Sequence, residues 1–363
     1  MQKIKILHVG EYVQGGVATY IKTLVAHENS NIENYILCSD YKSEHNWSLS
    51  ECQVKYYEYK RSVANIPKAI YFIYKVINCV APDIVYCHST WAGFFVRVPL
   101  LFTRKRFRVV YNAHGWSFLQ TVSKWKCCIY AWVEKTLSVK TDHIINVSKN
   151  EYEEAIRWGI DESLMSIIYS GISEEKEKNS IQINWPDDKI NILFVGRFDQ
   201  QKGIDILLEE FNKCSRADLQ LTVIGEGVLK ENNYKVKYGY DNVKFLGWVS
   251  HEEISAYYKA ADVVVMPSRW EAFGLVAIEA MKYGTPVIAS NCGALKEIIQ
   301  HNKNGYLFSL KKGELTSILQ KLSKKELIQL GKNAKLTFLQ RYRAEQMINK
   351  TEELYMEINF SKK

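Results

Sequence analysis

Ser268-Arg-Trp-Glu-Ala-Phe-Gly-Leu-Val-Ala-Ile-Glu-Ala-Met-Lys-Tyr-Gly-Thr-Pro-Val-Ile-Ala289 carries more information about the fold than any other segment of the chain. It follows the apolar run 263–266, which predicts a buried strand that the next proline ends. From Leu275 to Tyr283 the residues suit a helix, and Gly284 supplies its stop signal. A strand that leads through a short loop into a helix leaves backbone N–H groups free, so this segment predicts an anion site.

Two carboxylates lie on either side of this predicted helix start. Glu279 is one turn past Leu275, on the same helix face, so it can reach hydroxyls beside the anion. Glu271 precedes the helix and can reach the other end of the ligand. An anion flanked by two hydroxyl-binding carboxylates fits a sugar joined to a nucleoside by a diphosphate. The alternative is a pair of solvated glutamates, which the surrounding Phe-Gly and Gly-Thr-Pro-Val punctuation argues against.

The ungapped run Glu271-Ala-Phe-Gly-Leu-Val-Ala-Ile-Glu279 resembles the E-x7-E signature of the retaining glycosyltransferases of family four. That resemblance implies the α/β GT-B fold, in which two doubly wound Rossmann-like domains face each other across an interdomain cleft. It also implies that Glu271, with the adjoining backbone, holds the donor sugar and that the second glutamate holds the ribose hydroxyls. The donor-binding residues implied at this helix start are Phe273, Gly274, Leu275, Val276 and Glu279.

Length and composition fit a two-domain enzyme. The chain has 363 residues, beyond the size at which one core keeps growing, and its 47% of hydrophobic residues can fill two cores. The apolar run 69–74 stops at Lys75 and is too short to span a bilayer, and the N-terminus lacks the long apolar segment of a cleavable signal. Eight cysteines without metal-type pairing indicate reduced thiols, so we expect a cytoplasmic protein.

Short apolar runs alternate with amphipathic stretches in both halves of the chain, which implies parallel sheets covered on both faces. The predicted strands are 4–9, 34–38, 84–88, 108–112 and 143–147, then 190–195, 219–224, 243–245, 261–266 and 285–289. We expect a first, acceptor-side domain over 1–172, a polar linker over 173–189, a nucleotide-sugar domain over 190–340 and a C-terminal helix over 341–363. The resemblance implies that this last helix packs back on the first domain, whereas its pattern indicates only an amphipathic helix.

A second loop, Gly196-Arg197-Phe-Asp-Gln-Gln-Lys202-Gly203, holds two cations directly after a predicted strand. Arginine grips phosphate oxygens as a fork, and lysine adds a point charge. The loop resembles the family's Arg-plus-Lys pair, which stabilises the departing diphosphate; the alternative is that both side chains only cap or solvate the loop. The chain has no Asp-x-Asp motif for a divalent ion. Because two fixed cations and a helix N-terminus can replace that ion, we predict activity without metal or cofactor.

Two loops of the first half resemble family loops that face the donor. Gly15-Gly16 opens a helix, where glycine allows close approach to a phosphate or sugar, and its spacing is not the dinucleotide fingerprint G-x-G-x-x-G. His114 follows a strand, and the resemblance implies that it contributes to the sugar pocket, although a lone histidine is more often structural. His88 also follows a strand and is a weaker candidate, for acceptor contact.

Two loops of the second half resemble the family's nucleoside-binding turns. The turn at Gly225 follows the strand 219–224, and the loop that carries Trp248 follows the strand 243–245. In the family such loops read the base edge mainly through the main chain and line its slot with side chains. Without the family context, ordinary turn chemistry would explain both.

Net charge is +8, and the basic residues are unevenly placed. No acidic residue lies between Asp83 and Glu134, an interval rich in aromatic side chains. A basic aromatic surface there could attract an anionic membrane face or a phosphate-bearing acceptor. It could also attract nucleic acid, but no nucleic-acid-binding motif accompanies it. The remaining alternative is that the aromatics are core and the charges are solvated. The basic residues are Arg97, Arg104, Lys105, Arg106, Arg108, Lys124 and Lys126.

The resemblance implies a glycosyltransferase that moves a sugar from a nucleoside-diphosphate donor to a glycan hydroxyl with retention at the anomeric carbon. UDP is the commonest carrier in the family, and GDP is the alternative. A lipid-linked oligosaccharide at the cytosolic membrane face, as in lipopolysaccharide O-antigen or capsule assembly, is the acceptor suggested by analogy. The resemblance implies that the catalytic residues are Arg197, Lys202, Glu271 and His114. The rivals are a GT-B nucleotide-sugar epimerase, a non-catalytic nucleotide-sugar-binding scaffold and, least favoured, a nicotinamide-dependent oxidoreductase.

Overall fold

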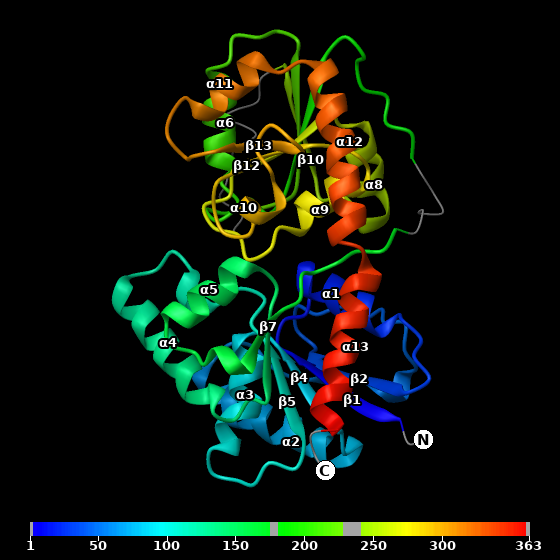
Figure 1. The fold of residues 1–363 in the computed structure, drawn as a ribbon, viewed down its shortest axis with the longest axis vertical. Coiled ribbons are helices and arrows are strands. Elements are labelled where there is room, and N and C mark those ends of the chain that lie inside the picture. Colours follow the sequence, from blue (N-terminus) through cyan, green and yellow to red (C-terminus); the bar gives the residue numbers. More distant parts are fainter. Residues whose placement is uncertain (1–2, 175–180, 228–240, 361–363) are drawn as a thin grey trace. The chain divides into compact units, whose positions relative to one another are not determined.

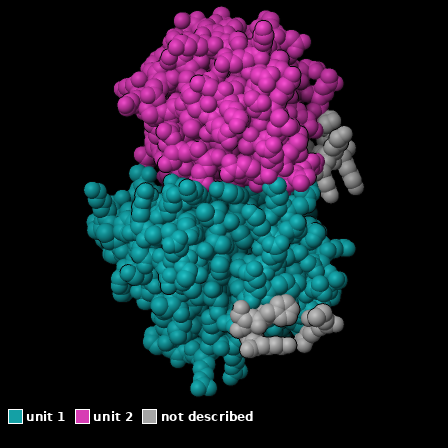
Figure 2. Space-filling view, viewed as in Figure 1, with its two compact units in different colours: residues 1–173, 344–363 teal, residues 174–343 magenta. Residues whose placement is uncertain are grey.

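The computed structural model describes residues 3–174, 181–227 and 241–360. The chain forms two compact units, one of residues 1–173 with 344–363 and one of residues 174–343 (Figure 2). Among the described residues, no helix is both long enough and apolar enough to cross a bilayer. All eight cysteines are free thiols.

The first unit is built on a seven-stranded parallel sheet with the order β3-β2-β1-β4-β5-β6-β7 (Figure 1). Every pair of neighbouring strands in it is parallel. Its strands are β1 (Ile4–Gly10), β2 (Ile32–Ser39), β3 (Val54–Tyr57), β4 (Ile84–His88), β5 (Arg108–Asn112), β6 (His143–Asn146) and β7 (Met165–Ile167).

Helices cover both faces of this sheet, because successive strand residues point to opposite sides. Leu7 and Val9 of β1 face the core formed with α2, α3, α4 and α5, whereas Ile4 and Ile6 face the core formed with α1 and α13. The helices are α1 (Gly16–Val25), α2 (Ile66–Val80), α3 (Thr90–Leu100), α4 (Lys124–Ser138), α5 (Lys149–Arg157) and α13 (Ala344–Phe360).

The last helix of the chain, α13, belongs to the first unit although 170 residues of the other unit precede it. It contacts α1, and Met347, Ile348 and Tyr355 are buried in the core on that face of the sheet (Figure 1). A side-chain hydrogen bond of 2.7 Å joins Asn29 Nδ2 to Glu352 Oε2 at its edge. The final residues of the chain therefore complete the hydrophobic core of its beginning.

The second unit has a six-stranded parallel sheet with the order β10-β9-β8-β11-β12-β13. Helices α6 and α11 pack together over one face, and α8 and α9 contact β8, β11 and β12. Its strands are β8 (Ile190–Val195), β9 (Leu219–Ile224), β10 (Val243–Gly247), β11 (Val263–Met266), β12 (Val287–Ser290) and β13 (Gly305–Phe308). Its described helices are α6 (Ile204–Asn212), α8 (His251–Ala260), α9 (Leu275–Lys282), α10 (Leu295–Ile298), α11 (Glu314–Lys321) and α12 (Lys324–Arg341).

Each sheet contains one point where the strand order reverses. In the first unit the chain builds outward from β1 to β3 and then starts again at β4, so the reversal lies between β1 and β4. In the second unit the same reversal lies between β8 and β11. Ligands of open α/β sheets bind outside the carboxyl ends of the strands at such points. The two reversals therefore identify the edge of each unit where a site is expected.

Candidate active site

Lys202 and Glu271 meet at the β8/β11 edge of the second unit. The loop after β8 supplies Lys202, the loop after β11 supplies Glu271, and Lys202 Nζ lies 2.7 Å from Glu271 Oε2. Their side chains are only 18% and 9% exposed, and Ser268 Oγ donates a second hydrogen bond to the same oxygen at 3.3 Å. The ammonium group has three donors, so it keeps two for a ligand. Two residues that are 69 positions apart thus form one partly buried charged pair.

Arg197 is tied to the same two loops. Its Nη2 lies 3.1 Å from Asp199 Oδ2 and 3.1 Å from Gln201 Oε1. Asp199 also accepts from the backbone N–H of Lys202, while Gln201 Nε2 donates to the carbonyl oxygen of Trp270. The arginine side chain is 58% exposed, so the guanidinium is oriented but open to a ligand. Arg197 and Lys202 are thus each paired with a carboxylate of the same unit.

Glu279 is oriented by a residue that the sequence analysis did not identify. The buried hydroxyl of Tyr258, on α8, donates to Glu279 Oε2 at 2.7 Å. Burial and the Glu279 carboxylate raise the pKa of Tyr258 well above its ordinary value, so the hydroxyl keeps its proton. The partly exposed Glu279 therefore has one oxygen fixed from behind, and the other can accept from a ligand hydroxyl. The only sequence signal for this pairing is a tyrosine on the helix that precedes β11.

Backbone N–H groups at the start of α9 add a third positive element. Gly274 is the N-cap residue of α9, and its φ of 103° lies in the left-handed region. No side chain donates or accepts a capping hydrogen bond there. Leu275 and Val276 open the helix and are partly exposed. Phe273 is buried, and its ring packs edge-on against Tyr342, so any ligand contact it makes is through its backbone. An uncapped helix start next to Glu271 leaves the backbone N–H groups on which the predicted anion site depends.

Close backbone contacts fix these loops against one another. A Cβ at Gly225 would lie 1.9 Å from the carbonyl oxygen of Gly196, and a Cβ at Gly293 would lie 2.0 Å from that of Glu271. Gly225 N–H donates to the carbonyl oxygen of Gly247, next to Trp248, whose side chain is 75% exposed. The loops after β8, β9 and β10 are thus in direct contact, with an uncovered indole at their edge. Most of the predicted donor-binding residues are brought together in this unit.

Gly16 and His114 belong to the first unit. Gly16 begins α1 and is exposed, after Gly15 at φ 57°. One turn later the ring of Tyr20 meets the ring of His114 edge-on, with 4.7 Å between centroids. His114 is itself left-handed, at φ 49°, and its backbone N–H donates to Asn112 Oδ1 at 2.8 Å. Burial lowers the pKa of His114 to about 3, so the ring is neutral at physiological pH.

His88 does not stand free for an acceptor. It is fully buried, and its Nδ1 lies 3.0 Å from His114 Nε2 while its Nε2 lies 2.9 Å from His8 Nδ1. Both of its ring nitrogens are therefore occupied by neighbouring histidines. The prediction that His88 contacts the acceptor is wrong, because the residue is internal to a row of rings.

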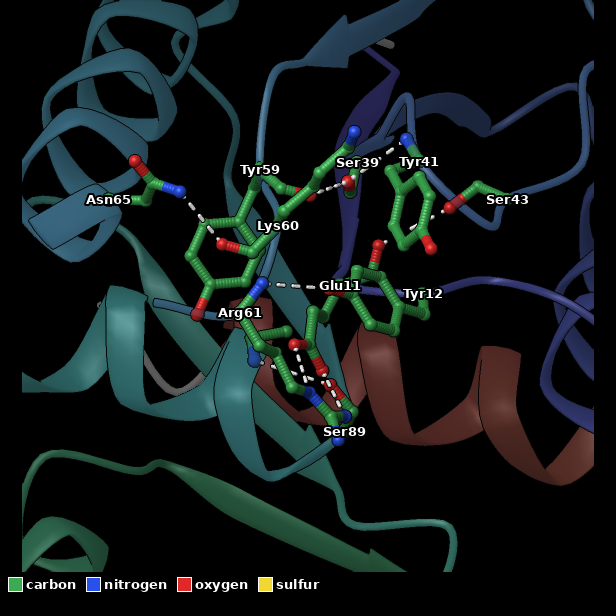
Figure 3. Close-up of polar contacts among 12 residues, drawn as sticks. Glu11, Tyr12, Ser39, Tyr41, Ser43, Tyr59, Lys60, Arg61, Asn65 and Ser89 are labelled. Carbon is green, nitrogen blue, oxygen red and sulfur yellow. Dashed lines mark hydrogen bonds and ion pairs between the residues drawn. The ribbon is translucent and has the colours of Figure 1, made fainter. Parts of the chain in front are cut away.

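A buried carboxylate braces the glycine loop (Figure 3). Glu11 is only 1% exposed, and its carboxylate accepts two hydrogen bonds from Arg61. Arg61 Nε donates to Oε1 at 2.7 Å, and Arg61 Nη2 donates to Oε2 at 2.8 Å. The guanidinium lies over the ring of Tyr12, 5.0 Å from its centroid, and the Arg61 N–H donates to the Tyr12 hydroxyl. The hydrogen bonds to Glu11 raise the pKa of Arg61 further. The loop that opens α1 is thereby tied to the connection between β3 and α2, a link that had no signal in the sequence.

The basic aromatic interval of the first unit is partly core. Arg97 is fully buried against Glu134 at 2.8 Å, and Lys105 and Arg108 both pair with Asp142. For this buried part of the interval the alternative holds, because its aromatic side chains are core and Arg97 forms an internal ion pair. What stays outside is the turn with Phe102, Arg104 and Arg106, together with one face of α4. The buried aromatics of the interval are Tyr86, Phe95, Phe107, Tyr111, Trp116 and Phe118.

Comparisons with known proteins agree with this architecture. Residues 14–176 match the family described as Glycosyltransferase Family 4, and residues 175–337 match Glycosyl transferases group 1. A protein of the cps region of Klebsiella pneumoniae is 35% identical over 84% of this chain and 86% of its own length. The UDP-Gal:alpha-D-GlcNAc-diphosphoundecaprenol alpha-1,3-galactosyltransferase of Escherichia coli is 26% identical over 81% of this chain and 80% of its own.

Solved structures share the fold at low sequence identity. Sucrose-phosphate synthase of Thermosynechococcus elongatus superposes with a TM-score of 0.83, at 22% identity, over 99% of this chain and 100% of its own. The Anabaena protein HepE, solved in complex with UDP-glucose, superposes with a TM-score of 0.76, at 18% identity, over 98% of this chain and 100% of its own. Two parallel-sheet units of this kind are the GT-B fold, and the chain belongs to the GT-B glycosyltransferases of the family-four type.

Proposed function

We propose that the protein is a retaining glycosyltransferase that moves a sugar from a nucleoside-diphosphate donor, with UDP as carrier, to a glycan hydroxyl. The observation that supports this most is the β8/β11 edge, where Lys202, Glu271 and Arg197 share one hydrogen-bonded network beside the uncapped start of α9. A diphosphate needs fixed positive groups, and a sugar and a ribose need acceptors for their hydroxyls. UDP as carrier is further supported by HepE, which was solved with UDP-glucose.

Each group has a role in the proposed reaction. Arg197 and Lys202 neutralise the diphosphate as the bond between its oxygen and the anomeric carbon breaks. Glu271 holds the donor sugar, Glu279 holds the ribose, and His114 contributes to the sugar pocket. The acceptor oxygen forms its bond on the face that the leaving group vacates, and its proton passes to a departing diphosphate oxygen. The residues supply charge and position, and no step in this scheme requires a metal ion.

Purified full-length protein with a panel of nucleotide sugars tests this function directly. Mass spectrometry should find one donor converted to free nucleoside diphosphate, faster with a glycan acceptor present than without it. We expect the rate to fall about 100-fold in both Arg197→Ala and Lys202→Ala, since charge-assisted contacts of this kind contribute roughly 3 kcal/mol to a transition state. EDTA should not change the rate. Turnover that EDTA abolishes and manganese restores contradicts the metal-independent scheme, and equal release without acceptor favours an epimerase.

We also propose a lipid-linked oligosaccharide acceptor, reached at the cytosolic face of an anionic membrane. The relative from Escherichia coli is named for a diphosphoundecaprenol acceptor. In this chain α4 has Trp125, Ile129 and Trp132 at 62%, 48% and 67% exposure, and their spacing places them on one helix face. The flanking exposed charges on α4 are lysines, because its one glutamate is buried. Aromatic side chains beside lysines suit the interface of an anionic bilayer.

Vesicle sedimentation separates this membrane proposal from the transferase proposal. Vesicles that contain phosphatidylglycerol should sediment the wild-type protein, and pure phosphatidylcholine vesicles should sediment it less. Replacing Trp125 and Trp132 by serine should abolish sedimentation while UDP binding stays unchanged. Tyr71→Ser, a 73%-exposed aromatic on α2, is the matched control and should bind as wild type. Equal sedimentation of the double variant and wild type would remove the role of α4 and leave the transferase proposal intact.

A further inference from the structure

Three histidine rings form a row at the β1/β4 edge of the first unit. His8 lies on β1, His88 ends β4, and His114 follows β5. Ring nitrogens of neighbouring members lie 2.9 and 3.0 Å apart, and the ring planes are nearly parallel, at 23° and 21°. These distances make the row a chain of hydrogen bonds. Among the described residues no group of three or more His, Cys, Asp or Glu could hold a metal ion.

The far end of the row is a side-chain amide. His8 Nε2 lies 3.2 Å from Oδ1 of Asn34, on β2. An amide oxygen can only accept, so the proton of the neutral His8 ring must be on Nε2, and its Nδ1 must be bare. A neutral imidazole has one donor and one acceptor nitrogen, so the position of the proton on one ring determines its position on the next ring.

Following the bonds outward gives one tautomer for each ring. His88 donates from Nε2 to His8 Nδ1, and its own Nδ1 is then an acceptor. His114 must donate from Nε2 to that acceptor, which leaves His114 Nδ1 without a proton. Among the described residues no hydrogen bond to this last nitrogen is found, and His114 as a residue is partly exposed. The row therefore ends in one hydrogen-bond acceptor that has no partner among the described residues.

We propose that Asn34, through His8 and His88, holds His114 as the Nε2-protonated tautomer and so presents its bare Nδ1 to a ligand hydroxyl. Asn34, His8 and His88 are positioning residues in this scheme, because none of them touches the ligand. That the ligand is a sugar rests on the proposed function, whereas the tautomer does not. A His114 ring with the opposite tautomer would present an N–H and would not accept from a sugar hydroxyl.

The surroundings keep all three rings neutral, which the scheme requires because a protonated ring donates from both nitrogens. Burial lowers the pKa of His8 to about 4, and burial together with its two neighbours lowers the pKa of His88 well below its ordinary value. Tyr20 and Tyr86 close the row from the side, and their hydroxyls are bonded to each other at 2.9 Å. The ring of Tyr86 lies only 4.0 Å from that of His88, centroid to centroid.

Nitrogen NMR on the full chain with ¹⁵N-labelled imidazoles tests the tautomer without any ligand. Protonated and bare ring nitrogens give well-separated signals, and a His114→Gln spectrum identifies the His114 signals among the eight histidines. At neutral pH we expect His114 with a proton on Nε2 and none on Nδ1. A proton on Nδ1 of His114 in the wild-type protein overturns the proposal.

Variants of Asn34 test the cause. Asn34→Asp keeps an acceptor and should keep the His114 signals at slightly alkaline pH, whereas Asn34→Leu removes it and should give a mixture of His114 tautomers. Asn31→Leu, an exposed asparagine near the same strand, should change nothing. For a donor that the wild type turns over, Asn34→Leu should lower turnover about five- to tenfold, close to one hydrogen bond. Unchanged His114 signals in Asn34→Leu overturn the role of Asn34, and absent wild-type turnover counts only against the transferase proposal.

Discussion

Removing one oxygen atom, with Tyr258→Phe, probes how Glu279 is held. The tyrosine ring is buried, so phenylalanine keeps the packing and loses only the hydroxyl. That hydroxyl is bonded to Glu279 Oε2 at 2.7 Å, and a hydrogen bond to a charged group contributes about 1.5–3 kcal/mol. Because Glu279 is partly exposed, water can replace the lost donor in part. We therefore expect the free energy of unfolding to fall by about 1–2 kcal/mol.

The effect on nucleotide binding follows from the same bond. In the variant, the Glu279 carboxylate has to be ordered when the ribose binds, and we expect the dissociation constant of UDP to rise about five- to tenfold, or roughly 1–1.4 kcal/mol. Titration calorimetry with UDP measures it, and urea unfolding measures stability. Tyr257→Phe is the control, because its partly exposed side chain is next in sequence and packs near Trp185 instead. If Tyr258→Phe binds UDP as tightly as wild type, the Tyr258 hydroxyl does not order Glu279 for the nucleotide.

Three further perturbations follow from named contacts. Arg61→Ala leaves the buried Glu11 unpaired, so urea unfolding should show a free energy of unfolding lower by about 1–3 kcal/mol. We expect the low end of this range because the Arg61 side chain is 58% exposed. An unchanged free energy of unfolding would contradict the bracing of the glycine loop. The pKa of His8 is about 4 in the folded protein and 6.5 in the unfolded chain, so the unfolded state binds the extra proton in this range. The free energy of unfolding should therefore fall as pH drops from 6.5 toward 4, by at most about 1.4 kcal/mol per pH unit. Urea unfolding at several pH values should show a smaller slope in His8→Gln. Gly293→Ala, at φ 47°, would place a Cβ 2.0 Å from the carbonyl oxygen of Glu271 and should lower the free energy of unfolding by more than about 2 kcal/mol. Gly313→Ala, at φ 86° in open space, should lower it by only about 1–2 kcal/mol. Equal losses in the two variants would mean that the backbone can move away from the added Cβ at Gly293.

Much of the fold was predictable because central strands are continuous apolar runs. Ile84–His88, Arg108–Asn112, Ile190–Val195 and Leu219–Ile224 have the predicted bounds. Of the edge strands, β10 was predicted, whereas β3 and β7 were missed; Val54–Tyr57 is short, contains a lysine and is only partly buried. An edge strand has one partner, so its sequence is less constrained by burial. Pattern alone therefore finds the centre of a parallel sheet better than its rims.

The candidate site was predictable in its loops but not in its supports. Glycines and charged residues directly after apolar runs pointed to Arg197, Lys202 and Glu271, because the carboxyl ends of neighbouring parallel strands meet. The partners Tyr258 and Glu11 lie on other elements, and no spacing rule connects them to the residues that they hold. The direction of the histidine row depends on Asn34, a single amide on a third strand. Such pairings arise only from the three-dimensional packing of the sheets.

The central claim, that fixed cations of the second unit hold a diphosphate, is tested most directly by comparing UDP with uridine. Titration calorimetry should give wild-type protein a preference for UDP over uridine of at least about 100-fold, since a diphosphate adds several charge-assisted contacts. Arg197→Ala and Lys202→Ala should each reduce that preference about tenfold or more and leave uridine binding unchanged. A preference for UDP that both variants retain in full would contradict the account.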